Sequence, residues 1–357
     1  MRSAAFLLLF CATGCGGGPA VLERVVELWH YDLPTKAAPP GIGAERRALI
    51  ATSEAGGNTG TFVTLDQSGG LPIEGPFTGI PLTDHAPVMI GTTVFVVTKI
   101  GSIVALDLAG QTKFMKAPIG GPAQTSPLLA VGDELRYGTA SGLVVALDAA
   151  TGDVRWQAAL NDPVLNRPAA GPSGRTYAGT DLGRVVGLDG TGQIVFDQNV
   201  AAPAGACAVL PSGDVAIAAG DGLSLFSPSG TLKWKHPRAA RVVGATALGD
   251  DVLAYGEDGL FERLDVGGNV KLSFRSRPAS DMNPPPFYAA PLPLPKDGFG
   301  LLDGNGTAHL IDSTAKEHAS FQGSVDILSE VGVSAVNSIL VADKSSIRAI
   351  QFVQAVE

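Results

Sequence analysis

The sequence has few charged residues, a shortage of basic ones and no long apolar run, and each shortage excludes a class of protein. Only 17% of the residues are charged while 45% are hydrophobic, which excludes an intrinsically disordered chain. The 25 basic residues are outnumbered by 34 acidic ones, and phosphate binding needs a concentrated basic surface, so nucleic acid is not an expected partner. The apolar run at residues 4–10 is shorter than the roughly 20 residues that span a bilayer. These limits leave a folded domain without a membrane-spanning helix.

Turn-forming residues are abundant. The chain of 357 residues contains 46 glycines and 25 prolines, so turns must be frequent. This composition favours many short strands over a helical bundle. Length alone would suggest two or three domains.

The first residues have the features of an export signal. Arg2 precedes the short apolar run, and small residues come directly before Cys15. This segment resembles the lipobox of bacterial lipoproteins, in which the cysteine thiol receives diacylglycerol before cleavage. The resemblance implies a signal peptide at residues 1–14, an acylated Cys15, a tether at residues 15–24 and sorting to the outer membrane. The alternative is an ordinary secretory peptide that leaves Cys15 unmodified.

Cysteine is too rare to form a disulfide framework. Cleavage would remove Cys11 and leave Cys15 and Cys207, so acylation of Cys15 would exclude a disulfide within the chain. Cys207 lies in an apolar, strand-like run with no second cysteine nearby. We therefore interpret it as a small buried hydrophobe and not as a reactive thiol.

One motif returns eight times along the chain. Its clearest copy, at residues 142–156, is an apolar strand that ends in an aspartate, followed by glycine and then by tryptophan. The positions equivalent to that aspartate are 66, 107, 148, 189, 227, 265, 312 and 351, with intervals of 41, 41, 41, 38, 38, 47 and 39 residues. A four-stranded propeller blade has about 40–45 residues. The spacing therefore predicts an all-β, eight-bladed β-propeller of four-stranded blades.

Each residue type in the motif has a mechanical role. Asp148 can accept hydrogen bonds from turn amides, and Gly152 supplies the positive φ of a tight hairpin. Trp156 is expected to pack its strand against a neighbouring blade.

The two ends of the chain predict how the ring closes. The eighth copy stops soon after its third strand, while an orphan strand near the N-terminus carries Trp29 in the role of Trp156. Pairing these segments would complete the last blade and remove an open sheet edge. Residues 25–357 are then one propeller domain, because repeat folds grow by adding units.

The pattern Ala-Leu-Asp-x-x-Thr-Gly-x-x-x-Trp at residues 146–156 resembles the PQQ-type β-propeller repeat. Two branches of that superfamily are relevant, the quinoprotein dehydrogenases and the outer-membrane lipoproteins that assist β-barrel assembly in the Bam complex. The lipidated cysteine, eight units and strand closure are similar to the second branch. The resemblance implies a periplasm-facing, non-catalytic scaffold whose partner is the periplasmic part of the β-barrel insertase, with no cofactor and no metal. The alternatives are a quinoprotein-like ligand-binding propeller and a cell-surface recognition propeller.

The five histidines fall in different repeats without the spacing of metal ligands, and we interpret each as a structural or a surface residue. They are His30, His85, His236, His309 and His318.

One departure from the period is a candidate for partner contact. The interval of 47 residues before Asp312 contains a proline-rich insertion, which favours an extended loop. Aromatic residues and arginine dominate interface hot spots. The proposed contact residues are Arg275, Arg277, Phe287 and Tyr288. The alternative is a spacer between blades whose aromatic side chains are tucked into the ring.

Overall fold

The computed structural model describes residues 23–353 apart from internal gaps. The gaps are residues 34–35, 37, 44–46, 52–58, 82, 84, 122–123, 202, 221, 277–284, 323–331, 335–336 and 344–345. The predicted signal peptide and Cys15 therefore lie outside the described residues. In the part of the chain that is described, no helix is long and apolar enough to cross a membrane.

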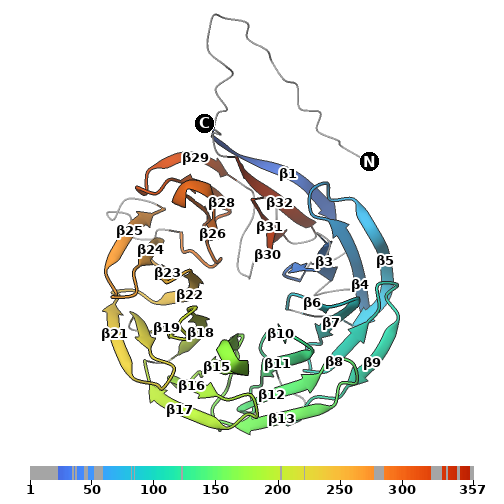
Figure 1. Cartoon of the computed structure of the whole chain (residues 1–357). Coiled ribbons are helices and arrows are strands. Elements are labelled where there is room, and N and C mark those ends of the chain that lie inside the picture. The colour runs from blue at the N-terminus through green and yellow to red at the C-terminus, as the bar shows by residue number, and fades with distance from the viewer. Residues whose placement is uncertain are drawn as a thin grey trace, which may run out of the picture.

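The strands form eight four-stranded antiparallel sheets arranged as blades around a ring (Figure 1). Blade 1 comprises β2 (Gly41–Ile42), β3 (Arg47–Ala51), β4 (Thr59–Asp66) and β5 (Pro72–Pro81). Blade 2 comprises β6 (Val88–Ile90), β7 (Thr93–Val97), β8 (Ile103–Leu106) and β9 (Thr112–Lys116). Blade 3 comprises β10 (Leu129–Val131), β11 (Glu134–Gly138), β12 (Leu143–Asp148) and β13 (Val154–Ala159). Blade 4 comprises β14 (Ala169–Ala170), β15 (Thr176–Gly179), β16 (Arg184–Leu188) and β17 (Ile194–Asn199).

The second half of the ring repeats this arrangement. Blade 5 comprises β18 (Ala204–Val209), β19 (Val215–Ala219), β20 (Gly222–Phe226) and β21 (Leu232–Pro237). Blade 6 comprises β22 (Val242–Leu248), β23 (Asp251–Gly256), β24 (Leu260–Leu264) and β25 (Val270–Arg275). Blade 7 comprises β26 (Leu292–Pro293), β27 (Phe299–Leu302), β28 (Thr307–Ile311) and β29 (Glu317–Gln322). Blade 8 comprises β30 (Gly332–Ser334), β31 (Ser338–Asp343), β32 (Ser346–Val353) and β1 (Arg24–Asp32). Two short 3-10 turns, Pro172–Gly174 and Pro295–Asp297, lie between the first and second strands of blades 4 and 7.

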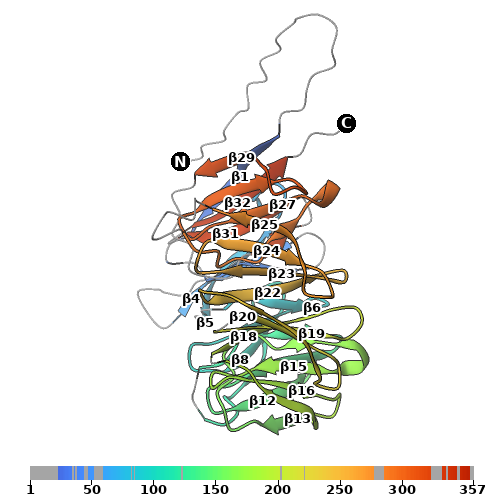
Figure 2. The same ribbon diagram turned by 90° about the vertical axis from the view of Figure 1, so that its left-hand side faces the viewer.

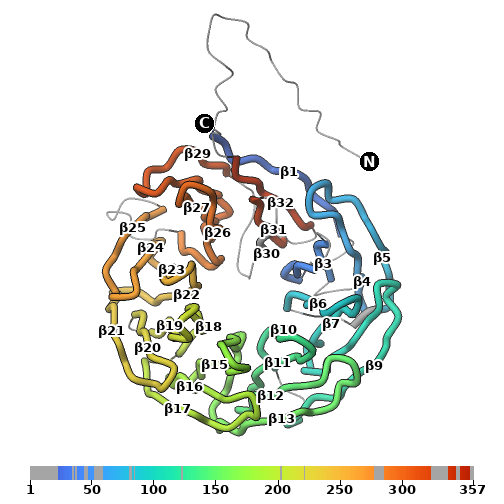
Figure 3. The backbone as a smooth tube through the Cα atoms, viewed as in Figure 1, coloured from blue at the N-terminus to red at the C-terminus, as the bar shows by residue number. Residues whose placement is uncertain are grey.

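The predicted fold and its closure are confirmed. In blade 8 the N-terminal strand β1 pairs with β32, and this pairing joins the two ends of the ring (Figure 3). Trp29 lies opposite Ala349, and the carboxylate of Glu27 accepts a hydrogen bond from Arg348 at 2.8 Å.

We label the strands of each blade A to D from the centre outward. Their turns lie on the two faces of the disc, which is seen from the side in Figure 2. The A–B and C–D turns lie on one side of each antiparallel sheet, and the B–C turns lie on the other, because successive strands reverse direction. We call these sides the turn face and the loop face. The connections between blades also lie on the loop face, since they join a D strand to the next A strand.

The repeated aspartates order the C–D turns as the sequence predicts. In blade 3 the backbone N–H groups of Ala150 and Thr151 donate to the Asp148 carboxylate at 2.8 and 3.0 Å. The side chain of Arg155 also donates to Asp148, and these hydrogen bonds together lower the pKa of that carboxyl. The carboxylate thus stays charged and holds the turn.

Adjacent blades meet where an aromatic ring of one D strand lies against a glycine of the next C–D turn. A methyl group placed on Gly192 would lie 2.6 Å from the ring of Trp156, too close for van der Waals contact. The same contact recurs around the ring between Trp29 and Gly70, Phe77 and Gly110, Phe114 and Gly152, Phe196 and Gly230, and Trp234 and Gly268. This is the interblade role that the sequence predicts for the aromatic residue. In blade 7 the turn has Ala315 with a φ of 66°, and Ala315 packs on the cluster that contains Phe274.

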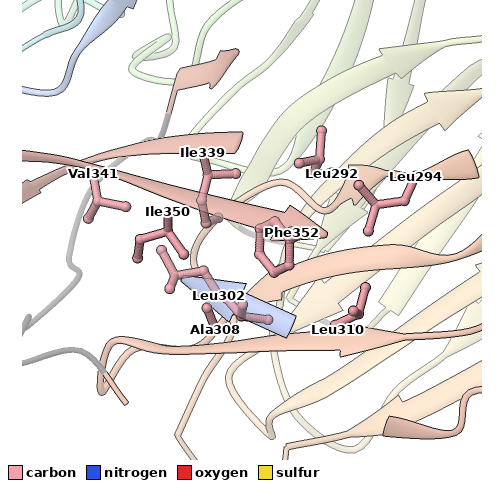
Figure 4. Close-up of a cluster of buried hydrophobic side chains, with 11 residues drawn as sticks. Leu292, Leu294, Leu302, Ala308, Leu310, Ile339, Val341, Ile350 and Phe352 are labelled. Atoms are coloured by element: carbon pink, nitrogen blue, oxygen red, sulfur yellow. The ribbon is translucent and has the colours of Figure 1, made fainter. Parts of the chain in front are cut away.

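The core is divided into hydrophobic clusters that lie between the sheets. The cluster between blades 7 and 8 in Figure 4 joins Leu302 and Leu310 to Ile350 and Phe352, and Val25 of β1 completes it. A second cluster joins Trp29 to Ile50 and Val63 of blade 1. The closing strand is therefore packed on both sides.

We expect Gly192→Ala to destabilise the protein more than Gly132→Ala. Both glycines have a positive φ, 83° and 60°, but nothing lies within 4 Å of a methyl group on Gly132. Gly132→Ala should cost about 1 kcal/mol for backbone strain alone. Gly192→Ala should cost a further 1–3 kcal/mol or so from overpacking against Trp156. Urea unfolding of the two variants measures the difference, and equal losses would show that the interblade contact contributes nothing.

We expect Trp29→Ala to lower the free energy of unfolding by about 3–5 kcal/mol, the usual loss for a buried tryptophan. The matched variant Trp29→Phe keeps a ring against Gly70 but loses the hydrogen bond from Nε1 to the Gln67 carbonyl, which is 2.8 Å long. It should lose only about 1 kcal/mol. Thermal unfolding tests both variants, together with a chain that lacks residues 21–33. If that shortened chain melts at the wild-type temperature, the closing strand does not stabilise the ring.

Candidate functional site

On the loop face of blades 3 and 4, each B–C turn is joined to the interblade connection that precedes its blade. The amide of Asp181 in the B–C turn of blade 4 donates to the Pro163 carbonyl of the preceding connection at 2.9 Å. The amide of Ala140 in blade 3 donates to the Gln124 carbonyl at 2.9 Å in the same way. These backbone hydrogen bonds hold this part of the loop face in a defined shape.

Two large aliphatic side chains stand exposed on this face. The B–C turns of blades 2, 3 and 4 have the form Thr-x-x-Gly, and the third position is Ile100, Ser141 and Leu182, spaced by 41 residues. Ile100 is 61% exposed and Leu182 is 72% exposed. Sequence reasoning missed these residues, although aligning the repeats would have found them, because only an alignment sets the two aliphatic residues beside Ser141.

The inner strands surround a cavity of about 540 Å³ at the centre of the ring. Small residues such as alanine and proline make up most of its wall. The polar lining side chains that the structure describes are Arg167, Cys207, Thr246, Tyr255 and Tyr288. No carboxylate is among these lining residues. Nor does any group of three His, Cys, Asp or Glu side chains in the described ranges have the arrangement of a metal site.

The structure places three of the four residues predicted to contact a partner, and it places them in different surroundings. Arg275 is half-buried at the end of β25, where its guanidinium donates to the Asp258 carbonyl at 2.5 Å. Tyr288 is half-buried and lines the central cavity. Arg277 lies outside the described residues. The contact itself stays a prediction.

The expectation that Phe287 is exposed is wrong. Its side chain is 1% exposed and packs near Phe274 and against the edge of His309, with ring centroids 6.4 and 6.2 Å apart. The Phe287 amide also donates to the Gly256 carbonyl at 3.0 Å, which fixes the chain against blade 6. The ring fills the space between blades 6 and 7 because that boundary offers an apolar surface. Burial of the ring therefore agrees with the spacer interpretation at this position.

A network of ion pairs occupies the loop face at blades 5 and 6. The buried guanidinium of Arg238 donates to Asp258 at 2.6 Å and to Glu262 at 2.9 Å. Arg241 pairs with Glu257 at 3.3 Å nearby. This part of the face is charged and internally paired, whereas the Ile100 and Leu182 turns expose apolar surface.

The most deeply buried of the predicted structural histidines is His309. Its ring nitrogens lie 3.3 Å from the Asp303 carboxylate and 2.8 Å from that of Glu317. Burial disfavours the charged ring, but the two carboxylates outweigh it and raise the pKa of His309. The histidine is thus a structural ion-pair partner between strands of blade 7.

Cys207 is buried with 8% of its side chain exposed. Burial raises the pKa of its thiol to about 12, so the reactive thiolate does not form at neutral pH. This burial agrees with the interpretation of Cys207 as a small hydrophobe.

Solved structures of the same fold cover nearly the whole chain. The computationally designed Ika8 protein matches with a TM-score of 0.74 at 15% sequence identity, over 92% of this chain and 99% of that one. BamB from Moraxella catarrhalis matches with a TM-score of 0.57 at 16% identity, over 93% of this chain and 99% of that one. A search of the curated proteins finds no match. At these identities the structural matches establish the fold alone.

The family follows from the sequence comparison. A PQQ-repeat family model described as outer membrane protein assembly factor BamB matches residues 26–170 and 140–261. These two matches cover more than half of the chain and lie on the blades whose repeats are most regular. With its eight blades and its interblade aromatic contacts, the chain belongs to the BamB family of PQQ-repeat propellers.

Proposed function

We propose that this protein is a non-catalytic outer-membrane lipoprotein that binds the periplasmic domains of the β-barrel insertase and supports the assembly of outer-membrane proteins. The observation that carries the proposal is the family match over residues 26–261, on an eight-bladed propeller. The rigid loop face supports it, because a pre-ordered surface loses little entropy when it binds a partner.

The proposed anchor is consistent with where the propeller begins. Residues 1–14 are a signal peptide in this proposal, Cys15 is acylated, residues 15–24 are the tether and residues 25–357 form the propeller. Strand β1 begins at Arg24, opposite Val353. Because β32 is a C strand and runs toward the turn face, β1 begins at the turn face. The anchor then leaves the loop face free for a partner.

The proposed partner surface is the loop face at blades 2 to 4. Ile100 and Leu182 add apolar area there, and neither belongs to a hydrophobic cluster in the part of the chain that the structure describes. A second proposed contact is the connection before blade 7, through Arg275, Arg277 and Tyr288.

A ligand-binding propeller is the alternative that the central cavity favours. Its volume of about 540 Å³ lies within the roughly 300–1,000 Å³ of small-molecule sites. Dye-linked oxidation after addition of pyrroloquinoline quinone and Ca²⁺ would support this alternative. For a cell-surface recognition propeller, protease digestion of intact cells would reach the protein.

We expect Cys15→Ser to release the protein from the membrane fraction, since the serine oxygen cannot replace the thiol in acyl transfer. The measurement is immunoblotting of membrane and soluble envelope fractions. Cys207→Ser is the control, because a buried thiol receives no lipid, and it should stay in the membrane fraction. A Cys15→Ser protein that remains membrane-bound would refute the anchor.

We expect Ile100→Ser with Leu182→Ser to weaken binding to the purified periplasmic domains of the insertase. Hot-spot side chains contribute roughly 2 kcal/mol or more, so Kd should rise at least tenfold or so. Serine is the residue that blade 3 has at this position, so the melting temperature should not fall. Leu232→Ser, on the outer strand of blade 5, is the control and should not change Kd.

An unchanged Kd in the double variant would place the contact elsewhere. If Arg277→Ala and Tyr288→Ala weaken binding instead, the contact lies at the connection before blade 7. If all these variants bind normally and no barrel component co-purifies from envelope membranes in mild detergent, the proposed partner is wrong.

A further inference from the structure

Blade 1 breaks the polar pattern of the repeat at two exposed positions. The strand registers align Pro72 with Thr112, Val154, Ile194, Leu232, Val270 and Glu317, so the neighbouring positions can be compared blade by blade. Before that residue blade 1 has Leu71, and after it Ile73. Both residues face solvent, with 70% and 43% of their surface exposed.

The other blades with a C–D turn are polar at both positions, except blade 4, which has Val195 at the second one. At the position of Leu71 they have Gln111, Asp153, Gln193, Thr231, Asn269 and Lys316. At the position of Ile73 they have Lys113, Arg155, Val195, Lys233, Lys271 and His318. Blade 1 is therefore the one blade of the seven in which both positions are aliphatic. Nothing in the packing of blade 1 uses these side chains, since neither belongs to a hydrophobic cluster among the described residues.

The apolar pair is held rigidly. The Leu71 carbonyl accepts a hydrogen bond from the Asp66 amide at 2.9 Å, which closes the turn. On the other side, Glu74 pairs with Arg47 at 2.9 Å, so the neighbouring carboxylate is neutralised. The pair thus lies between the turn that Asp66 orders and a Glu74 carboxylate that is already paired.

The pair lies beside the strand that leads to the proposed anchor. Gly70 lies against the ring of Trp29, so Leu71 is next to β1 at the rim of the ring. Trp29 is five residues from Arg24, about 17 Å along an extended strand. At the start of that strand Glu23 pairs with His318 of blade 7, and His318 also lies 2.7 Å from Asp312. This contact fixes the place where the tether leaves the propeller.

The tether is short. Eight peptide units join Cys15 to Glu23, and a fully extended chain covers at most about 3.3–3.6 Å for each, or roughly 26–29 Å in all. An acylated Cys15 would therefore keep the rim formed by β1 and the start of β5 within a few tens of ångströms of the bilayer. Other parts of the rim expose apolar residues such as Leu232, but they belong to blades away from the tether (Figure 1).

We propose that Leu71 and Ile73 form a membrane-contact edge that rests in the headgroup region of the lipid bilayer, a second attachment beside the acyl anchor. The inference rests on the proposed lipidation of Cys15. Apolar side chains at an interface add to the binding of a lipid anchor, which is more stable with two signals than with one. With this edge on the membrane, the disc stands on its rim and both faces remain open to proteins.

The test uses vesicles that supply the attachment independently of acylation. The mature chain with Cys15→Ser and an N-terminal hexahistidine tag is held on phosphatidylcholine vesicles with nickel-chelating lipid. A single cysteine at Leu71→Cys, or at the control Leu232→Cys on blade 5, carries an environment-sensitive fluorophore; the buried Cys207 is not labelled. We expect the emission at position 71 to rise and shift to the blue on attachment, while the emission at position 232 stays unchanged.

A second variant removes the edge without disturbing the fold. Leu71→Gln with Ile73→Lys installs the residues that blade 2 has at these positions, so the melting temperature should not fall. Retention on the nickel-lipid vesicles should weaken at least about tenfold, because the two aliphatic side chains would be only partly buried in the headgroup region.

Three results would overturn the membrane-contact edge. They are equal emission changes at positions 71 and 232, unchanged retention of the double variant, and a response at position 71 that depends on protein concentration without vesicles. The last would indicate contact between two copies of the chain. Because the tag replaces the acyl group, these results are independent of the Cys15→Ser fractionation, so the failure of one proposal is distinguishable from the failure of the other.

Discussion

The propeller depends on the contact between an aromatic side chain and a glycine, which recurs at six of the eight boundaries between blades. Since no side chain fits between the Trp156 ring and Gly192, the thickness of the ring sets the distance between the sheets. The same spacing recurs from Trp29 and Gly70 to Trp234 and Gly268, so these six boundaries share one geometry. In blade 7 Ala315 takes the place of the glycine. The hydrophobic clusters fill the remaining space between neighbouring sheets. In blade 3 the aspartate of the C–D turn serves the contact as well, because it holds the glycine in the conformation that faces the aromatic ring. In blade 5 the hydroxyl of Ser227 takes the place of the aspartate.

Most of the fold could be predicted from the sequence because the repeat makes it local. Asp148, Gly152 and Trp156 each make contacts within one blade or with an adjacent blade, so their spacing in the sequence is enough to predict the blade. The closing strand was predictable because Trp29 repeats the role of Trp156. The burial of Phe287 was not, since it lies outside the period and its surroundings depend on how blades 6 and 7 meet. Ile100 and Leu182 were missed for another reason. They are exposed because they lie in turns, and the exposure of a single hydrophobic residue cannot be recognised from the residues around it in one repeat.

Different surfaces of the propeller carry different kinds of side chains. The loop face has apolar tips at blades 2 and 4 and a paired ionic network at blades 5 and 6. The turn face has the repeated aspartates, whose lowered pKa values keep them charged. The centre is a cavity with few polar groups, and blade 1 has an apolar edge at the rim. With this division, the proposed anchor, the proposed membrane-contact edge and the proposed partner surface use different residues of one domain.

The pairing of β1 with β32 also determines the order in which the molecule can form. Glu27 and Arg348, which face each other across this pairing, are 321 residues apart in the chain. The entropy of closing such a long loop opposes the pairing until the intervening blades have condensed. A chain that emerges from its N-terminus first therefore keeps β1 without its partner until β32 has appeared. Completion of the ring thus requires all eight blades, and a chain terminated before β32 would remain an open arc with an unpaired edge at its first strand.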